Sequence, residues 1–494
     1  MLTKEEIVKS VPQTGFVGQP RGLFSLFFTE FWERFSYYGM RAILIFYMYY
    51  AVKDGGLGLD RTEANIIMSL YGSLIYMSGI IGGWIADRIT GTRKAVFYGG
   101  ILIMIGHIVL SLPGGVTTLF TSMAFIIIGT GLLKPNVSSI VGDLYADNDS
   151  RRDAGFSIFY MGINLGSFTS AIVTGWLQKE WGFHAGFLAA AIGMAIGLIV
   201  FIWKQKDLGL AGSQAPNPLL PHERKKSAIL FGIGSLVVAV LVIVAIVTDN
   251  FTIENISLVI TSLGIAIPTI LITIMYRSKK TTADEKSRVL AYIPLFVCAV
   301  MFWAIADQSA TILATFIDTR TDLTVGSFEI PAAWFQSINP MFIFALAPVF
   351  ALLWTKLGDR GPATSKKFAL SLFFSGASFF VMIIPIVMAG DGELINPLWV
   401  LLSFLLVVIG ELLLSPVGLS ATTKLAPAAF AGQTMALWFL ASAAASAINA
   451  QLVRIYEVVS EVTYFGVLGG ISVILGVILL IMSPIIQRAM RGIK

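Results

Sequence analysis

The first long apolar run of the chain contains the stretch Glu30-Phe31-Trp32-Glu33-Arg34-Phe35-Ser36-Tyr37-Tyr38-Gly39. This run, residues 23–50, is long enough to cross a bilayer, because about 20 residues suffice. A charge at the bilayer centre costs on the order of 2.5–3.5 kcal/mol. On a helix, Glu30, Glu33 and Arg34 lie largely on the face that also carries Arg41. These four groups therefore need partners, water or a function.

The composition indicates a polytopic membrane protein. The chain has 494 residues, of which 56% are hydrophobic and 13% charged, whereas soluble domains carry about 25% charged residues. The net charge of +5 does not indicate nucleic-acid binding, because the basic residues lie in short loops between apolar runs. With Cys298 as the single cysteine and three histidines, neither a disulfide framework nor a metal site is expected.

The hydrophobic pattern predicts fourteen spanning helices in a 6 + 2 + 6 arrangement. The predicted spans are residues 23–50, 63–87, 95–112, 117–142, 154–178, 184–204, 228–248, 255–276, 290–318, 332–355, 366–388, 397–420, 431–454 and 463–487. With the N-terminus in the cytoplasm, 26 of the 34 lysines and arginines fall in cytoplasmic segments and 5 in external ones. The positive-inside rule therefore predicts that both termini are cytoplasmic. No cleavable signal peptide is expected, because the first 22 residues are polar.

Two six-helix halves joined by basic linkers resemble a transporter with the major facilitator fold, which has a central cavity between two bundles. The loop Gly82-Gly83-Trp84-Ile85-Ala86-Asp87-Arg88 is similar to the Asp/Arg signature of that superfamily; its glycines are expected to allow close helix packing, and Asp87 to pair with basic neighbours. The predicted segments are a cytoplasmic N-terminus (1–22), an N-terminal bundle (23–204), linkers with two extra helices (205–289), a C-terminal bundle (290–487) and a cytoplasmic tail (488–494).

Three more ionisable residues lie deep in predicted spans: Lys134, Asp307 and Glu411. Such residues mark functional sites by default. Lys134 is interpreted as facing a cavity, although a long lysine can also reach the interface. Asp307 is interpreted as a switch whose partner is Arg41, and Glu411 as a carboxylate that binds a substrate amine. The alternative for both acids is a static contact between helices.

The stretch 30–39 resembles the ExxERFxYYG signature of the proton-dependent oligopeptide transporter (POT/PTR) family. The stretch Phe156-Ser157-Ile158-Phe159-Tyr160-Met161-Gly162-Ile163-Asn164-Leu165-Gly166-Ser167 resembles the second signature of that family. The resemblance runs over nearly the whole chain, including the extra helix pair of bacterial members. It implies proton-coupled import of di- and tripeptides by alternating access, with no cofactor beyond the proton gradient.

The resemblance also implies roles for individual residues. Proton coupling is assigned to Glu30, Glu33, Arg34, Lys134, Arg41 and Asp307. Peptide binding is assigned to Arg41 and Lys134 at the carboxylate end, to Asn164, Asn339 and Glu411 at the amine end and backbone, and to Tyr37, Tyr38, Tyr71, Trp438 and Ser442 as lining residues. One position departs from the family pattern, because similar proteins carry a glutamate where this chain has Asp307.

Other classes fit the residues less well. An enzyme would need a nucleophile beside a matching base, and none of the three histidines has one in sequence. A channel would need rings of like charge rather than single sites of mixed sign. A proton-coupled carrier of another anion, such as nitrate, would leave Glu411 without a cationic partner. The expected protein is a monomer in a bacterial plasma membrane, and its expected partners are di- and tripeptides, protons and membrane lipid.

Overall fold

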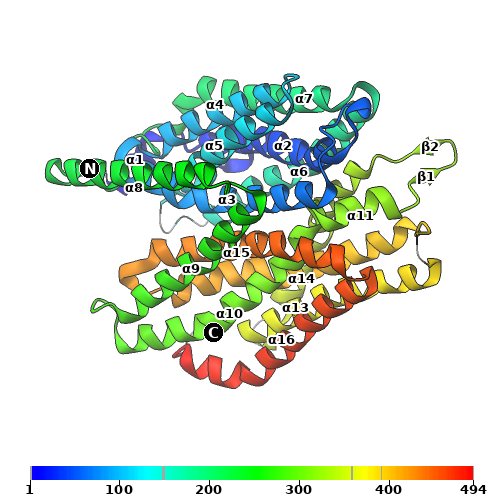
Figure 1. Ribbon diagram of the computed structural model, residues 1–494. Coiled ribbons are helices and arrows are strands. Elements are labelled where there is room, and N and C mark those ends of the chain that lie inside the picture. Colours follow the sequence, from blue (N-terminus) through cyan, green and yellow to red (C-terminus); the bar gives the residue numbers. More distant parts are fainter. Residues whose placement is uncertain (1–2, 147–148, 150, 358–359, 391, 493–494) are drawn as a thin grey trace. The chain divides into compact units, whose positions relative to one another are not determined.

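The computed structural model describes residues 3–146, 149, 151–357, 360–390 and 392–492. Over these residues the chain is almost entirely helical (Figure 1). The α-helices and strands are α1 Lys4–Ser10, α2 Arg21–Tyr49, α3 Arg61–Ile85, α4 Thr92–Leu110, α5 Gly115–Asp143, α6 Arg152–Trp181, α7 Phe183–Trp203, α8 Pro221–Val247, α9 Ile253–Arg277, α10 Ala283–Ala306, α11 Ile312–Arg320, β1 Thr324–Val325, β2 Phe328–Glu329, α12 Ile338–Leu357, α13 Thr364–Ala389, α14 Pro397–Leu425, α15 Ala431–Val458 and α16 Glu461–Ala489. The shorter 3-10 and π-helical segments are η1 Phe16–Gly18, η2 Val52–Asp54, η3 Ala86–Thr90, η4 Gln205–Leu208, η5 Asp307–Ala310, η6 Ala332–Ser337 and η8 Ala428–Phe430.

The prediction of an all-helical polytopic membrane protein is confirmed. In the described part of the chain, 13 helical spans are long and apolar enough to cross a membrane. They correspond to the second to fourteenth predicted spans. The first predicted span is α2, which has 29 residues and is set apart from the others by its five charged side chains, Arg21 at its start and four more within the span. Of the predicted terminal segments, residues 1–2 and 493–494 lie outside the described residues.

Two local predictions were wrong. The predicted helix 290–318 is interrupted: α10 ends at Ala306, η5 forms a tighter turn, and Thr311 has non-helical angles (φ −129°, ψ −107°) before α11 begins. Asp307 therefore lies at a helix break and not in the middle of a helix. The seventh predicted span, residues 228–248, begins too late, because α8 already begins at Pro221, a residue suited to the first helical position.

The chain divides into two compact units. Unit 1 comprises Met1–Ser36, Met77–Ile163 and Leu188–Ile260, and unit 2 comprises Tyr37–Tyr76, Asn164–Phe187 and Thr261–Lys494. Five spanning helices, α2, α3, α6, α7 and α9, therefore contribute residues to both units. The two halves of the charged stretch in α2 belong to different units, with Glu30, Glu33 and Arg34 in unit 1 and Arg41 in unit 2.

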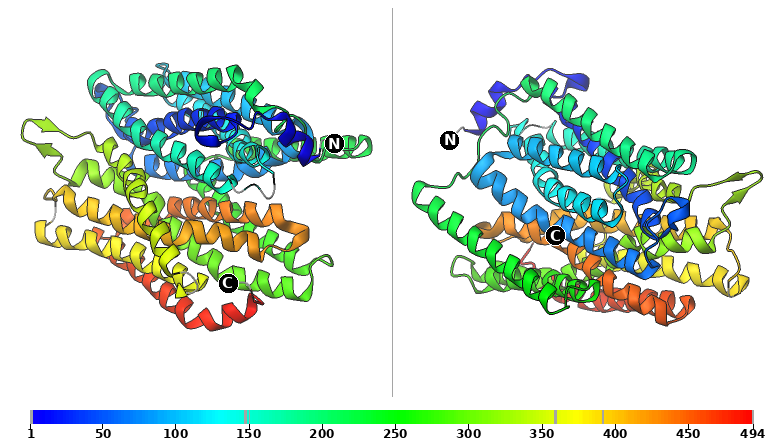
Figure 2. Two further views of the ribbon diagram at one scale, coloured as in Figure 1. Left: turned by 180° about the vertical axis from the view of Figure 1, so that it is seen from behind. Right: turned by 45° about the horizontal axis from the view of Figure 1, so that its top comes forward.

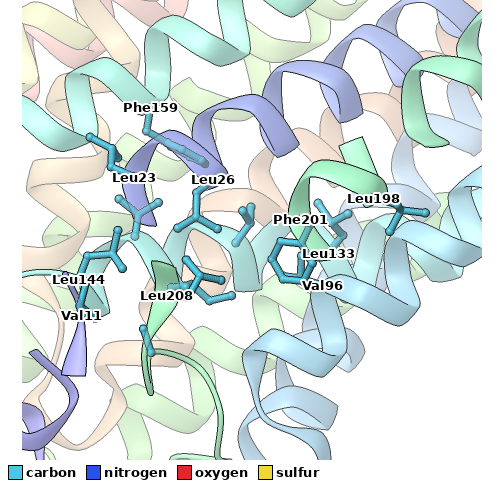
Figure 3. Close-up of a cluster of buried hydrophobic side chains, with 14 of the residues drawn as sticks. Val11, Leu23, Leu26, Val96, Leu133, Leu144, Phe159, Leu198, Phe201 and Leu208 are labelled. Atoms are coloured by element: carbon cyan, nitrogen blue, oxygen red, sulfur yellow. The ribbon is translucent and has the colours of Figure 1, made fainter. Parts of the chain in front are cut away.

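Unit 1 has a core of apolar side chains from five spanning helices (Figure 3). Leu26 of α2, Leu133 of α5 and Phe201 of α7 are each at most 1% exposed. Helices α4 and α5 touch backbone to backbone, since a Cβ added at Gly99 would lie 2.6 Å from the carbonyl oxygen of Gly129. Small residues at such crossings allow close helix packing in a membrane.

In unit 2, α13 packs against both α14 and α16 (Figure 1). Serine hydroxyls connect α13 to α16 at two levels, with Ser375–Ser472 at 2.9 Å and Ser365–Ser483 at 2.7 Å. The strands β1 and β2 form an antiparallel hairpin that pairs Thr324 with Glu329. This hairpin projects beyond the helices of its unit (Figure 2). Its turn begins at Gly326, whose φ of 64° favours glycine.

Candidate functional site

The charged stretch of α2 forms a buried ion cluster in unit 1. Arg34 Nε lies 3.1 Å from Glu30 Oε1 and also donates to Glu33 Oε2. All three residues are at most 3% exposed. The spacing along the helix explains the arrangement, because residues i and i+4 lie on the same face. Two carboxylates and one guanidinium leave an excess negative charge, which is costly in a membrane interior.

Lys134 of α5 supplies the balancing charge, because it interacts electrostatically with Glu30. It lies next to the point where α3 and α5 meet. There a Cβ added at Gly82 would lie 1.9 Å from the carbonyl oxygen of Gly131. The sequence predicted each of these four charged residues as a coupling residue, and the structure brings them together within one unit.

The Asp/Arg loop, between α3 and α4, differs from expectation. Asp87 has no ion pair among the described residues; its backbone oxygen instead accepts from Asn217 N at 3.0 Å. The ion pair belongs to Arg88, whose Nη2 lies 2.6 Å from Glu223 Oε2 of α8. Of the two glycines expected to aid packing, only Gly82 makes a close approach, because an added Cβ at Gly83 would meet nothing within 4 Å.

In unit 2 a second charged cluster surrounds the helix break at Asp307. Ser446 Oγ of α15 donates to Asp307 Oδ2 at 2.8 Å. Asp307 also interacts electrostatically with Arg41 of α2 and with Glu411 of α14. Arg41, the predicted partner of Asp307, is therefore close enough to interact with it electrostatically. Tyr37, Tyr38 and Tyr76 are the other groups that act electrostatically on Arg41.

Gln308, the residue after Asp307, holds the break in place. It is fully buried. Its amide nitrogen donates to Ala304 O at 3.0 Å and to Asn449 Oδ1 of α15 at 3.4 Å, and its amide oxygen accepts from Tyr464 of α16 at 3.0 Å. Side chains from two other helices thus satisfy the side-chain amide of Gln308, the residue beside the helix break.

Glu411 and Asn339 are brought together, with Asn339 Nδ2 donating to Glu411 Oε2 at 3.3 Å. This contact joins α12 to α14. Trp438 of α15 is 5% exposed and lies over Gly418 of α14, where an added Cβ would come within 2.0 Å of the indole ring. The other predicted lining residues, Tyr37, Tyr38, Tyr71 and Ser442, also belong to unit 2, as does Asn164, which was predicted to bind the amine end and backbone. Lys134 is the one predicted peptide-binding residue that belongs to unit 1.

Sequence reasoning missed a third polar cluster, at the end of α2. Tyr49 donates to Asp318 Oδ2 at 2.5 Å and Tyr50 donates to Asp318 Oδ1 at 2.7 Å. The guanidinium of Arg61 lies 5.5 Å from the centre of the Tyr49 ring. In the same unit, Trp334 Nε1 donates to Ile172 O at 3.0 Å. The only sequence signal for this Asp318 cluster was one more carboxylate at the end of an apolar run.

Buried charged clusters on a scaffold of long apolar helices are typical of polytopic membrane transporters. The chain matches the sequence model described as the POT family over residues 93–474. It is 57% identical over 493 residues to the uncharacterized transporter YclF of Bacillus subtilis, covering 100% of this chain and 99% of that protein. It is 44% identical to a di-/tripeptide transporter of Lactococcus lactis subsp. cremoris, covering 97% and 98%. A crystal structure of peptide transporter POT in complex with sulfate matches at a TM-score of 0.96 and 60% identity, covering 100% of both chains.

The chain belongs to the POT family. The family predicted from the two signatures is confirmed, and so is the major facilitator fold. Members of this family are transporters, so the rival class of membrane enzyme is excluded.

Proposed function

We propose that this chain imports di- and tripeptides together with protons across the plasma membrane of a bacterium, by alternating access. Support comes from the relatives, since one is named a di-/tripeptide transporter and a solved neighbour is named a peptide transporter. In this proposal the protein is a monomer surrounded by membrane lipid, with both termini in the cytoplasm. It uses no cofactor, because the proton gradient supplies the free energy.

One observation carries the assignment of a peptide: Arg41 and Glu411, of opposite charge, both interact with Asp307 within unit 2. A short peptide is a zwitterion, so its site needs a positive group for the carboxylate and a negative group for the amine. We place the carboxylate at Arg41 and the amine at Glu411 and Asn339, all in unit 2. The assignment of Lys134 as a second cation rests on the family resemblance alone. An inorganic anion such as nitrate would have no use for Glu411.

The remaining predicted residues would form adaptable walls. Tyr37, Tyr38, Tyr71 and Trp438 offer aromatic surface to varied side chains, while Asn164 and Ser442 offer hydrogen bonds to the peptide backbone. Binding sites commonly combine a few fixed polar groups with mostly apolar walls.

Proton coupling follows from the charge around Asp307. While ionised, Asp307 attracts Arg41; once protonated, it no longer does, and Arg41 is free to bind the peptide carboxylate. The cluster of Glu30, Glu33, Arg34 and Lys134 would take part in the same coupling in unit 1. One proton supplies roughly 2.3 kcal/mol per 100 mV and about 1.4 kcal/mol per pH unit. Together these support a gradient of about 500-fold for a net-neutral peptide.

Uptake into proteoliposomes with an imposed proton gradient tests the proposal. Labelled dipeptide should accumulate, and unlabelled dipeptides and tripeptides should compete, whereas free amino acids and nitrate should not. Glu411→Gln should weaken dipeptide binding by about 10- to 100-fold, the loss of a charged hydrogen bond. Asp307→Ala should abolish accumulation, whereas Asp322→Asn, at an exposed carboxylate, should not. Competition by nitrate without competition by dipeptides would overturn the substrate assignment, and normal accumulation by Asp307→Ala would overturn the coupling role.

A further inference from the structure

Unit 1 has a groove between the end of α3 and the start of α8 that no step of peptide transport uses. It has a volume of about 390 Å³ and is lined by Trp84, Arg88, Leu219, Glu223, Lys226, Ser227 and Leu230. The volume falls within the range of small-molecule sites, about 300–1,000 Å³. The lining is divided, with basic and hydroxyl groups beside apolar side chains.

The walls of this groove are tied together by several hydrogen bonds. Leu219 N donates to Arg88 O at 3.0 Å, which connects the segment before α8 to η3, the element that follows α3. The Arg88–Glu223 ion pair connects η3 to α8 at 2.6 Å, and Glu223 Oε2 also accepts from Leu220 N at 3.0 Å. The groove is therefore a built feature of unit 1.

The groove lies at the start of the apolar part of α8, where a spanning helix would enter the membrane. Lys226 and Ser227 are the last polar residues before residues 228–247 of α8, which carry no charge. Helix α8 has no buried residue, so its apolar surface faces lipid. Trp84 is 38% exposed, and exposed tryptophans are typical of the headgroup level. An occupant of the groove would therefore meet headgroups at one end and acyl chains at the other.

The charge of the lining selects the occupant. Glu223 already pairs with Arg88, whereas Lys226 has no ion pair among the residues that the structure describes. The groove therefore has an excess positive charge beside the apolar Leu219 and Leu230, and basic sites between spanning helices bind anionic headgroups.

We propose that this groove binds an anionic phospholipid. The headgroup phosphate contacts Lys226 and Ser227, and the start of the acyl chains lies against Leu230 and Trp84. On the proposed orientation this is the cytoplasmic leaflet. The bound lipid stabilises the contact of α8 with the Asp/Arg loop, and peptide binding does not require it.

Native mass spectrometry of the purified full-length protein, titrated with phosphatidylglycerol or phosphatidylcholine, tests the proposal. The wild type should retain phosphatidylglycerol at lower lipid concentrations than phosphatidylcholine. Lys226→Gln should weaken phosphatidylglycerol binding about fivefold, as expected for one basic residue. Lys225→Gln, next in the chain but outside the groove, is the matched control and should change it less than twofold.

A thermal-shift arm separates a lipid from free phosphate. Phosphatidylglycerol should raise the unfolding temperature of the wild type and of Lys225→Gln, and should raise that of Lys226→Gln less. Equal stabilisation by inorganic phosphate, equal binding of phosphatidylcholine, or equal weakening by the two lysine substitutions would each overturn the proposal. Dipeptide uptake by Lys226→Gln serves as the check that the variant is folded.

Discussion

Ser446 donates a hydrogen bond to Asp307 across 139 residues of sequence, at the break between α10 and α11. The bond connects α15 to the carboxylate that we propose as a proton site. Asp307 is one methylene shorter than the glutamate expected from the family pattern, so its position depends strongly on such a partner. Ser446 is thus a positioning residue for Asp307, whereas Arg41 is its charge partner.

Removal of the Ser446 hydroxyl should reveal an interaction free energy between Ser446 and Asp307. Ser446→Ala should destabilise the wild type by about 0.6–1.7 kcal/mol, the range measured for hydrogen bonds between membrane helices. The same substitution should have little effect when Asp307 is already alanine, because the acceptor is gone. A double-mutant cycle of unfolding free energies measures the difference. Equal destabilisation in both backgrounds would show that Ser446 acts through packing alone.

The crossing of α3 and α5 offers a test with a built-in control. In Gly82→Ala the new methyl would lie 1.9 Å from Gly131 O. We therefore expect this substitution to destabilise unit 1 by about 1–3 kcal/mol or more, the usual penalty for overpacking. Gly83→Ala, one residue later in the same helix, meets nothing within 4 Å. It should be neutral or stabilising by up to ~1 kcal/mol, the gain in helix propensity. Thermal unfolding of the two variants, measured side by side, tests this difference in stability. Similar transition temperatures would contradict the close approach of Gly82 to Gly131.

Long apolar runs made most spanning helices predictable, because a segment in the bilayer must satisfy its own backbone hydrogen bonds and does so as a helix. The break after Asp307 was not predictable, since residues 307–311 contain neither glycine nor proline. At this break the side chain of Gln308 is hydrogen-bonded to Asn449 and Tyr464, on two helices that are distant in the sequence. The charged candidates could be found singly, because each is expensive in a membrane. Neutral partners such as Ser446 carry no such signal, and a single sequence contains no information on which helices meet.

The contact of Trp438 with Gly418 predicts an effect on substrate binding. In Gly418→Ala the added methyl would lie 2.0 Å from the indole, so the ring must move. Because Trp438 is proposed to line the peptide site, we expect the Kd for dipeptides to rise about tenfold, the loss of part of a buried aromatic contact (~1.4 kcal/mol). Gly432→Ala, at the start of α15 with nothing within 4 Å, is the control and should bind normally. An unchanged Kd in Gly418→Ala would argue against a direct role for this ring.

The Asp318 cluster holds α2 against α11, and on the proposed orientation this end faces the outside of the cell. Alternating access would require its two hydrogen bonds to break whenever the site opens outward. Tyr49→Phe with Tyr50→Phe removes both donors to Asp318 while keeping the rings. At about 0.6 kcal/mol per interhelical bond, the outward-open population should rise about eightfold.

Labelling from outside measures that population. With Cys298 replaced by alanine and a cysteine placed at Asn164, an impermeant maleimide should react about eightfold faster in the double phenylalanine variant. Tyr47→Phe is the matched control, because Tyr47 lies in the same helix and its hydroxyl has no hydrogen bond among the described residues; it should label at the parental rate. If the double variant labelled no faster than Tyr47→Phe, the cluster would be a fixed brace and the opening toward the outside would have to break other contacts.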